Sequence, residues 1–161
     1  MTQQAEETRR LEAGERAPAW RMASDEATEV SSADLAGERY VLYFYPKDDT
    51  PGCTKQACGI RDNIGRITAT GVKLFGVSPQ NVKSHQKFRE KYALPYPLLA
   101  DDDHRVADAF GVWILKQFAG KSYHGNERST FVIGPDGVIE HVLPKVKPEE
   151  HVDQLLEVLA A

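Results

Sequence analysis

The chain has 161 residues, of which 41% are hydrophobic and 27% are charged. This composition argues against disorder and predicts one globular domain, residues 1–161, with its own core. The formal net charge of −4 gives no general attraction to nucleic acid or to anionic membranes, so neither is expected as a partner. No apolar run approaches the roughly 20 residues that span a bilayer, and no signal-peptide pattern opens the chain. We therefore expect a cytoplasmic protein.

The first half of the chain predicts a strand followed by a helix. Residues 1–13 are polar and charged, which predicts a loosely held extension. The nearly continuous apolar run at residues 40–45 predicts a strand buried on both faces, as in a parallel sheet. Residues 46–49 form a loop, and from residue 51 to about residue 69 the pattern becomes helical.

The rest of the chain continues this alternation and predicts an α/β layered domain. Strands are expected at residues 72–77, 98–100, 130–133 and 138–142, and helices at residues 81–92 and 148–160, with another ending at Phe110. The turn at residues 134–137 predicts that the last two strands form a hairpin. The acidic triplet at residues 101–103 could suggest a metal site, but a solvated turn whose last member, Asp103, caps the following helix is favoured.

Cys53 and Cys58 are the two cysteines of the chain. In the cytosol a disulfide is usually transient and serves catalysis or redox sensing. Two thiols cannot complete a four-ligand zinc site, and the five histidines are scattered. We therefore expect neither a metal nor a cofactor. Composition alone allows a plainer alternative, in which both cysteines pack as small buried apolar residues.

The residues around Cys53 favour a reactive thiol. Thr50 is a good N-cap residue and Pro51 suits the first helical position, so a helix is expected to begin here. Cys53 then falls in the first turn, where backbone N–H groups lack helical partners and the helix dipole is positive. Cysteines in such positions can have a pKa lowered to about 3.5–7.5, and the thiolate is the nucleophilic form.

The helical pattern also constrains how the two sulfurs can meet. Cys53 shares one inward-facing stripe with Ala57, Ile60, Ile64 and Ile67. Cys58 lies about 140° round the helix axis, with its Cα roughly 8.7 Å from that of Cys53. A disulfide needs Cα atoms within about 7 Å. Either the pair never bonds, or the helix unwinds when it does.

Glycine positions bear on that choice. Gly59 directly follows Cys58, and Gly65 lies further along the same predicted helix. Each glycine inside a helix costs about 1 kcal/mol relative to alanine, which favours unwinding. The alternative is that Gly59 only permits close packing.

The segment YPKDDTPGCTKQAC, residues 45–58, resembles the active-site segment of peroxiredoxins. It is most similar to the bacterioferritin comigratory protein, or Q-type, subfamily. The PxxxTxxC motif of that family corresponds to Pro46, Thr50 and Cys53, and a second cysteine five residues later marks its two-cysteine members. Further similar segments are FGVSP, FGVW and ERSTFVI, so the resemblance extends from about residue 11 to the C-terminus.

The resemblance implies a thioredoxin-like fold, with a central mixed β-sheet flanked by helices. It implies a thiol peroxidase that reduces hydrogen peroxide and organic hydroperoxides in antioxidant defence. Cys53 would be the peroxidatic cysteine and become a sulfenic acid. Cys58 would be the resolving cysteine and form an intramolecular disulfide with it. Thioredoxin or a similar dithiol protein would reduce that disulfide. The subfamily is commonly monomeric, so a monomer is expected.

The same resemblance implies roles for the surrounding residues. The Thr50 hydroxyl would lie beside the sulfur and the peroxide, and Pro46 would shield the site from water. Arg128, from the edge of a later strand, would favour the thiolate and polarise the O–O bond. Gln56 would orient Arg128, and Tyr45 would support the pocket wall.

Other interpretations remain open on the residues alone. Thr50 could serve only as a cap, Pro46 only as a strand terminator, and Arg128 as a surface charge paired with Glu127. A thiol–disulfide oxidoreductase would use a similar cysteine at a helix start, although such enzymes usually carry C-x-x-C. A redox sensor that passes a peroxide signal to a partner would use the same Cys53 chemistry.

Overall fold

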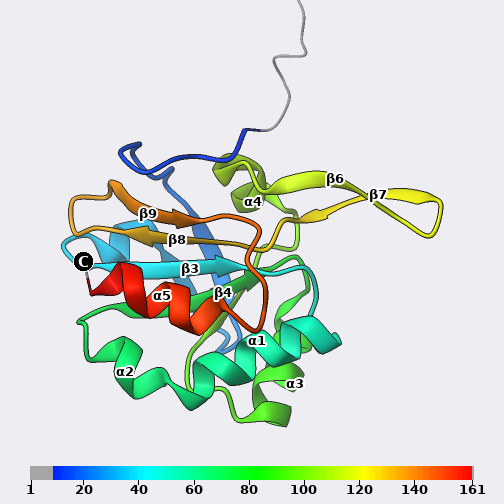
Figure 1. The fold of residues 1–161 in the computed structure, drawn as a ribbon, viewed down its shortest axis with the longest axis horizontal. Helices are drawn as coiled ribbons and strands as arrows, with labels where there is room; N and C mark the ends of the chain where they lie inside the picture. The colour runs from blue at the N-terminus through cyan, green and yellow to red at the C-terminus, as the bar shows by residue number, and fades with distance from the viewer. Residues whose placement is uncertain (1–8, 161) are drawn as a thin grey trace, which may run out of the picture.

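A mixed β-sheet forms the centre of the computed structural model, which describes residues 9–160 (Figure 1). Its seven strands lie in the order β2-β1-β5-β4-β3-β8-β9. Parallel pairing joins β3 to β4 and β4 to β5, whereas β8 and β9 are antiparallel to their neighbours. The strands are β1 (Arg21–Ser24), β2 (Glu29–Ser31), β3 (Tyr40–Phe44), β4 (Lys73–Ser78), β5 (Leu98–Ala100), β8 (Ser129–Ile133) and β9 (Ile139–Leu143).

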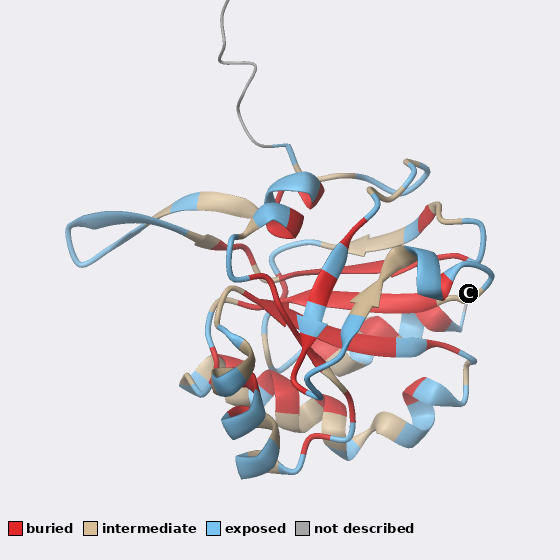
Figure 2. Ribbon diagram, turned by 180° about the vertical axis from the view of Figure 1, so that it is seen from behind, coloured by how far each residue is buried: buried red, intermediate tan, exposed pale blue. Residues whose placement is uncertain are grey.

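Helices cover both faces of this sheet, which confirms the predicted mixed sheet with flanking helices. Alternate side chains of β3 point into two separate cores, so the strand is buried along its whole length (Figure 2). Val41 and Tyr43 share one core with Cys53, whereas Leu42 and Phe44 lie in the other. The helical segments are η2 (Ser32–Leu35), α1 (Pro51–Asp62), α2 (Ile64–Thr68), α3 (Val82–Tyr92), α4 (Arg105–Phe110) and α5 (His151–Leu159).

The helix predicted over residues 51–69 is interrupted at Asn63. Its side-chain amide donates a hydrogen bond of 2.9 Å to the Gly59 carbonyl, and its backbone ends α1 before α2 begins. An asparagine that bonds nearby backbone groups competes with the helical ladder, which explains the break. The inward stripe is otherwise as predicted, with Ala57, Ile60 and Ile67 fully buried.

The β6–β7 hairpin was not predicted. β6 (Trp113–Phe118) and β7 (Lys121–Asn126) pair only with each other and extend away from the main sheet (Figure 1). Its apolar residues are largely exposed, with Leu115 at 58% and Phe118 at 74%. Trp113 at the base of the hairpin packs against a core, whereas most of its other residues are exposed. The sequence of the hairpin therefore lacks the regular polar and apolar alternation of a half-buried strand.

The acidic turn before α4 differs from the prediction. Asp101 is buried, and its two carboxylate oxygens accept from the backbone N–H groups of Val106 and Ala107 at 3.0 and 2.8 Å. Burial raises the pKa of Asp101. Asp103 is exposed, accepts from the Arg105 N–H at 3.2 Å and forms an ion pair with the Arg105 guanidinium at 3.5 Å. Asp101, rather than Asp103, therefore bonds the free N–H groups at the start of α4, because the chain turns inward directly after β5.

Part of the predicted N-terminal extension, residues 1–8, lies outside the described residues. Residues 9–13 are attached to the body of the protein, contrary to the prediction of loose attachment. The Leu11 N–H donates to the Phe110 carbonyl at 3.1 Å, and Arg10 forms an ion pair with Glu127 at 2.6 Å. Within residues 9–160 no helix is long and apolar enough to cross a membrane. The assignment of the whole chain to one domain stays a prediction.

Candidate active site

Cys53 lies in the first turn of α1 and is 1% exposed. Thr50 occupies the N-cap position with extended backbone, and Pro51 is the first helical residue, as the sequence predicts. The Thr50 hydroxyl does not cap the helix, because it donates instead to the Lys47 carbonyl at 3.1 Å. The unpaired N–H groups of the first turn and the positive end of the helix dipole thus remain beside the sulfur, where they favour negative charge.

Arg128 brings a guanidinium to the same sulfur from the residue just before β8. Its Nη1 lies 3.4 Å from the Cys53 Sγ and donates a 2.6 Å hydrogen bond to the Gln56 Oε1. A Cβ added to Gly52 would lie 3.2 Å from the Arg128 Nη2, so the missing side chain leaves room for this approach. The structure therefore brings together three residues that the sequence analysis singled out, from positions up to 75 residues apart.

The surface ion pair considered for Arg128 is not formed. Glu127 pairs instead with Arg10, at 2.6 and 3.0 Å, and also accepts from the Ser129 hydroxyl. Burial raises the pKa of Glu127, but the hydrogen bonds from Arg10 and Ser129 outweigh it and leave the pKa below its usual value. Arg128 is thereby left to face Cys53 and Gln56.

Behind Gln56 lies a histidine that the sequence analysis did not identify. His151, the first residue of α5, is fully buried, with its Nδ1 3.0 Å from the Gln56 Nε2. Its Nε2 lies 2.9 Å from the Thr130 Oγ1. Burial, together with the charge of Arg128, lowers the pKa of His151 to about 3. The available signal was a histidine on the predicted apolar face of the closing helix.

The loop between β3 and α1 is held by a buried carboxylate. Asp48 accepts from the Tyr45 hydroxyl at 2.6 Å and from the Ser84 hydroxyl at 2.7 Å, and the His85 Nδ1 lies 2.6 Å away. Tyr45 thus points its hydroxyl at the loop, and burial, with the nearby Asp48, raises its pKa. Pro46 is half-buried in this loop. Within residues 9–160, no hydrogen bond joins Thr50 to Cys53.

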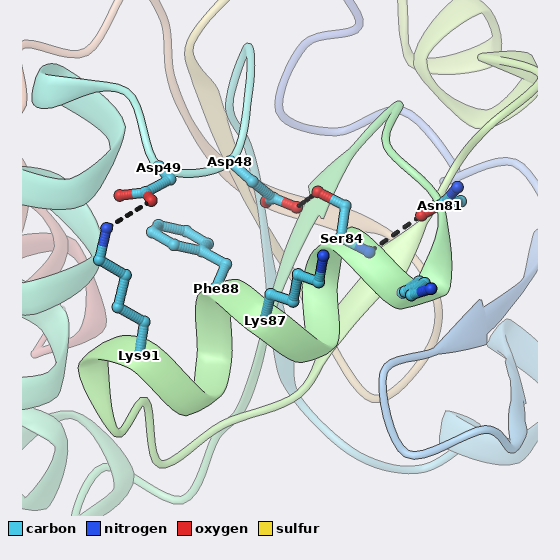
Figure 3. A pocket seen from close by; sticks show the side chains of 8 residues that line it. Asp48, Asp49, Asn81, Ser84, Lys87, Phe88 and Lys91 are labelled. Carbon is cyan, nitrogen blue, oxygen red and sulfur yellow. Dashed lines mark hydrogen bonds and ion pairs between the residues drawn. The ribbon is translucent and has the colours of Figure 1, made fainter.

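A hollow of about 560 Å³ lies over the outer side of this loop and along α3 (Figure 3). Lys91 pairs with Asp49 at 2.8 Å across it, while Phe88 forms part of its wall. Neither Cys53 nor Arg128 lines it. The residues with reactive chemistry therefore lie elsewhere, at the start of α1.

Cys58 lies on the same helix as Cys53, half-buried, and both thiols are free. Since α1 is continuous from Pro51 to Asp62, the helical separation of the two Cα atoms, roughly 8.7 Å, applies. This arrangement fits a reduced pair. Within the part of the chain that the structure describes, no group of three or more histidine, cysteine or acidic side chains could hold a metal ion.

Comparison with known proteins decides the family. The model of the AhpC/TSA family matches residues 13–142, which is most of the chain. The chain belongs to the AhpC/TSA family. Its curated relatives are named peroxiredoxins, and peroxiredoxins are thiol peroxidases. The chain is therefore an enzyme, a peroxidase of the oxidoreductase class.

Individual relatives narrow the group within the peroxiredoxins. The chain is 47% identical to the putative peroxiredoxin Bcp of Coxiella burnetii, over 91% of this chain and 97% of that one. It is 44% identical to peroxiredoxin Bcp of Bacillus subtilis, over 92% and 95% of the two chains. The predicted resemblance to the bacterioferritin comigratory, Q-type peroxiredoxins is confirmed.

Solved structures of this group share the fold. A cysteine mutant of Xanthomonas campestris peroxiredoxin Q matches with a TM-score of 0.85 and 34% identity, over 93% of this chain and 98% of that one. A cysteine mutant of the Xylella fastidiosa protein matches with a TM-score of 0.88 and 29% identity, over 94% and 97%. The thioredoxin-like fold of the peroxiredoxins is thus confirmed for this chain.

Proposed function

We propose that this peroxiredoxin reduces peroxides by a two-cysteine mechanism, in which Cys53 is the nucleophile and Cys58 the resolving residue. The observation that carries the proposal is the position of Cys53, in the first turn of α1 with the Arg128 Nη1 3.4 Å from its sulfur. A cation and unpaired helix N–H groups at one sulfur favour the thiolate, which is the form that attacks peroxides.

In the first step the Cys53 thiolate attacks the terminal oxygen of a hydroperoxide. The S–O bond forms, the O–O bond breaks, and the leaving oxygen departs with the bonding electron pair and takes up a proton as water or an alcohol. Cys53 is oxidised to the sulfenic acid. Arg128 stabilises the charge that develops on the oxygens. Hydrogen peroxide and organic hydroperoxides both fit this chemistry.

In the second step the Cys58 thiolate attacks the sulfenic sulfur. The S–S bond forms, the S–O bond breaks, and hydroxide leaves and is protonated to water. Because an intact helix holds the Cα atoms roughly 8.7 Å apart, part of α1 unwinds for this bond to form. Thioredoxin or a similar dithiol then supplies two electrons, through a mixed disulfide, and returns both thiols.

The loop before α1 completes the proposed site. Thr50 accepts a hydrogen bond from the bound peroxide, since its hydroxyl lies on the N-cap residue of the reactive helix and uses its own proton to bond the Lys47 carbonyl. Pro46, half-buried in the loop after β3, limits the access of water to the site. We propose a monomer that acts in the cytoplasm, where a dithiol reductant is present.

The test is peroxide-dependent NADPH oxidation with hydrogen peroxide, thioredoxin and thioredoxin reductase. The parent enzyme is compared with Cys53→Ser and Cys58→Ser. Sustained turnover that is lost in both variants supports the two-cysteine mechanism, and Cys58→Ser is expected to react once and then stall or over-oxidise. Turnover retained by Cys53→Ser, or normal cycling of Cys58→Ser with thioredoxin, contradicts it.

This assay, together with thiol titration and insulin reduction, separates the competing functions. A redox sensor loses one titratable thiol rapidly on addition of peroxide but does not cycle with thioredoxin. A thiol–disulfide oxidoreductase reduces insulin rapidly without consuming peroxide. The separation of Cys53 and Cys58 on an intact helix argues against that second alternative, because such enzymes usually hold both sulfurs in one turn.

A further inference from the structure

A chain of buried side-chain contacts runs from β8 to the reactive sulfur. Thr130 Oγ1 lies 2.9 Å from the His151 Nε2, and the His151 Nδ1 lies 3.0 Å from the Gln56 Nε2. Gln56 Oε1 in turn accepts from Arg128, whose Nη1 also lies 3.4 Å from the Cys53 Sγ. His151 and Gln56 are 0% and 1% exposed, so no solvent substitutes for these contacts.

The direction of each hydrogen bond follows from one fact. The Arg128 guanidinium has donors and no acceptor, so Gln56 must turn its carbonyl oxygen towards it. The amide nitrogen of Gln56 then faces His151 and can only donate. The His151 Nδ1 must therefore carry no proton and accept this bond. A neutral imidazole with a bare Nδ1 carries its proton on Nε2, which donates to the Thr130 Oγ1.

We propose that His151 is a positioning residue for the peroxidase reaction: its bare Nδ1 fixes Gln56, and Gln56 holds Arg128 against Cys53. This inference rests on the proposed roles of Cys53 and Arg128. His151 itself touches neither the sulfur nor the peroxide. It acts by preventing rotation of the Gln56 amide. Such a rotation would turn the N–H groups of Gln56 towards the guanidinium.

The surroundings of His151 keep its imidazole ring neutral, as an unprotonated Nδ1 requires. The ring is buried against that of Tyr43, with centroids 5.7 Å apart, and the charged group facing it along the chain of contacts is the cation Arg128. Burial and this cation lower the pKa of His151 to about 3. An imidazolium would present an N–H to the N–H of Gln56, and the contact between them would be lost.

The chemical test measures the reaction of Cys53 with hydrogen peroxide in single turnover, in a Cys58→Ser background. His151→Leu removes the acceptor at similar volume and is expected to slow the reaction at least about tenfold. His151→Asn places an amide oxygen near the former Nδ1 and is expected to restore most of the rate. Gln56→Leu combined with His151→Leu should lose little more than either change alone.

A packing control separates positioning from general support of the fold. Leu155 is fully buried on the same helix and in the same core. Leu155→Ala is expected to lower the melting temperature while the rate constant stays near the parent value. Equal losses of rate in His151→Leu and Leu155→Ala, or no loss in His151→Leu, overturn the inference.

A second readout does not depend on activity. In ¹⁵N-histidine NMR spectra at pH 7, His151 is expected as the neutral form with its proton on Nε2. A charged ring, or a proton on Nδ1, overturns the inference even if the enzyme is active. If the parent enzyme does not react with peroxide, the proposed function fails. The NMR spectrum still tests the tautomer of His151, so the two failures can be told apart.

Discussion

Cys53 and Cys58 lie on one uninterrupted helix, α1, and face directions about 140° apart around its axis. Their thiols are free, and the helical separation of their Cα atoms exceeds the roughly 7 Å that a disulfide allows. The proposed disulfide therefore requires a conformational change in α1 as well as chemistry. The free energy of unwinding this segment contributes to the rate of the second step.

The first prediction concerns Gly59, which directly follows Cys58. A methyl group added here would meet the Val152 Cγ2 at 3.5 Å, an ordinary contact, so Gly59→Ala fits the reduced structure. The change should stabilise α1 by about 1 kcal/mol and slow disulfide formation by about fivefold. Stopped-flow tryptophan fluorescence after a peroxide pulse measures this step. An unchanged rate would mean that Gly59 serves packing alone.

Gly65→Ala provides the matched control for this prediction. Gly65 lies in α2, beyond the break at Asn63, and no atom lies within 4 Å of a Cβ placed there. The substitution should raise the helix propensity of α2 without changing the segment that joins the cysteines. The same slowing in both variants would point to a general effect on stability.

The second prediction concerns the charge at the sulfur. Arg128→Ala removes the guanidinium 3.4 Å from Cys53 and should slow the reaction with hydrogen peroxide by about a hundredfold. Arg128→Lys keeps the positive charge but lacks the planar guanidinium that contacts Gln56 and the sulfur at the same time. Its rate should therefore lie between those of Arg128→Ala and the parent. Stopped-flow measurement of Cys53 oxidation gives both values.

Arg10→Ala is the control for this second prediction. Arg10 carries the guanidinium that pairs with Glu127, the neighbour of Arg128 in the chain. The comparison is made in a Glu127→Gln background, because a Glu127 carboxylate without Arg10 would be free to pair with Arg128. In that background the change takes one positive charge from the same region without changing the groups at the sulfur. Loss of rate comparable to that of Arg128→Ala would show that net charge, rather than the contact with Cys53, is what matters.

The sequence predicted the part of the site that depends on local signals. Thr50 and Pro51 mark a helix start, the spacing of Cys53 with Ala57 and Ile60 marks its buried face, and the structure has both. These features are encoded within about three turns of one helix. The meeting of Arg128 with Gln56, across 72 residues, has no local signature, and only the resemblance to peroxiredoxins pointed to it.

The sequence missed features that are set by tertiary structure. His151 lies 95 residues from its partner Gln56, and a histidine on an apolar helix face gives no sign of what it bonds. The β6–β7 hairpin is stabilised mainly by its own pairing, so it lacks the buried alternation that marks a strand. Asp101 looked solvated because it stands in an acidic run, yet the inward turn after β5 buries it.

The third prediction separates Asp101 from Asp103. Asp101 accepts from two N–H groups at the start of α4, so Asp101→Ala should leave them without partners and lower the free energy of unfolding by about 1–2 kcal/mol. Asp103→Ala should change it by less than about 0.5 kcal/mol, because that carboxylate is exposed. Urea denaturation at pH 7 measures both. Equal losses in the two variants would contradict the assignment of the cap to Asp101 alone.

The fourth prediction is a pH dependence of stability that arises from His151. Its pKa is about 3 in the folded protein, against about 6.5 for an unperturbed histidine, so the unfolded state binds more protons between these values. The free energy of unfolding should therefore fall as the pH drops below about 6.5, at up to about 1.4 kcal/mol per pH unit from this group, with no contribution at higher pH.

Urea denaturation of the parent and of His151→Asn between pH 7 and pH 4 isolates this contribution, because carboxylates titrate in both proteins. The parent should lose about 3 kcal/mol relative to the variant by pH 4. His124→Asn is the matched control, since His124 is exposed on β7 and its replacement should leave the pH dependence of the parent unchanged. Parallel curves for the parent and His151→Asn would show that His151 is not held neutral, and would remove the basis for a bare Nδ1 facing Gln56.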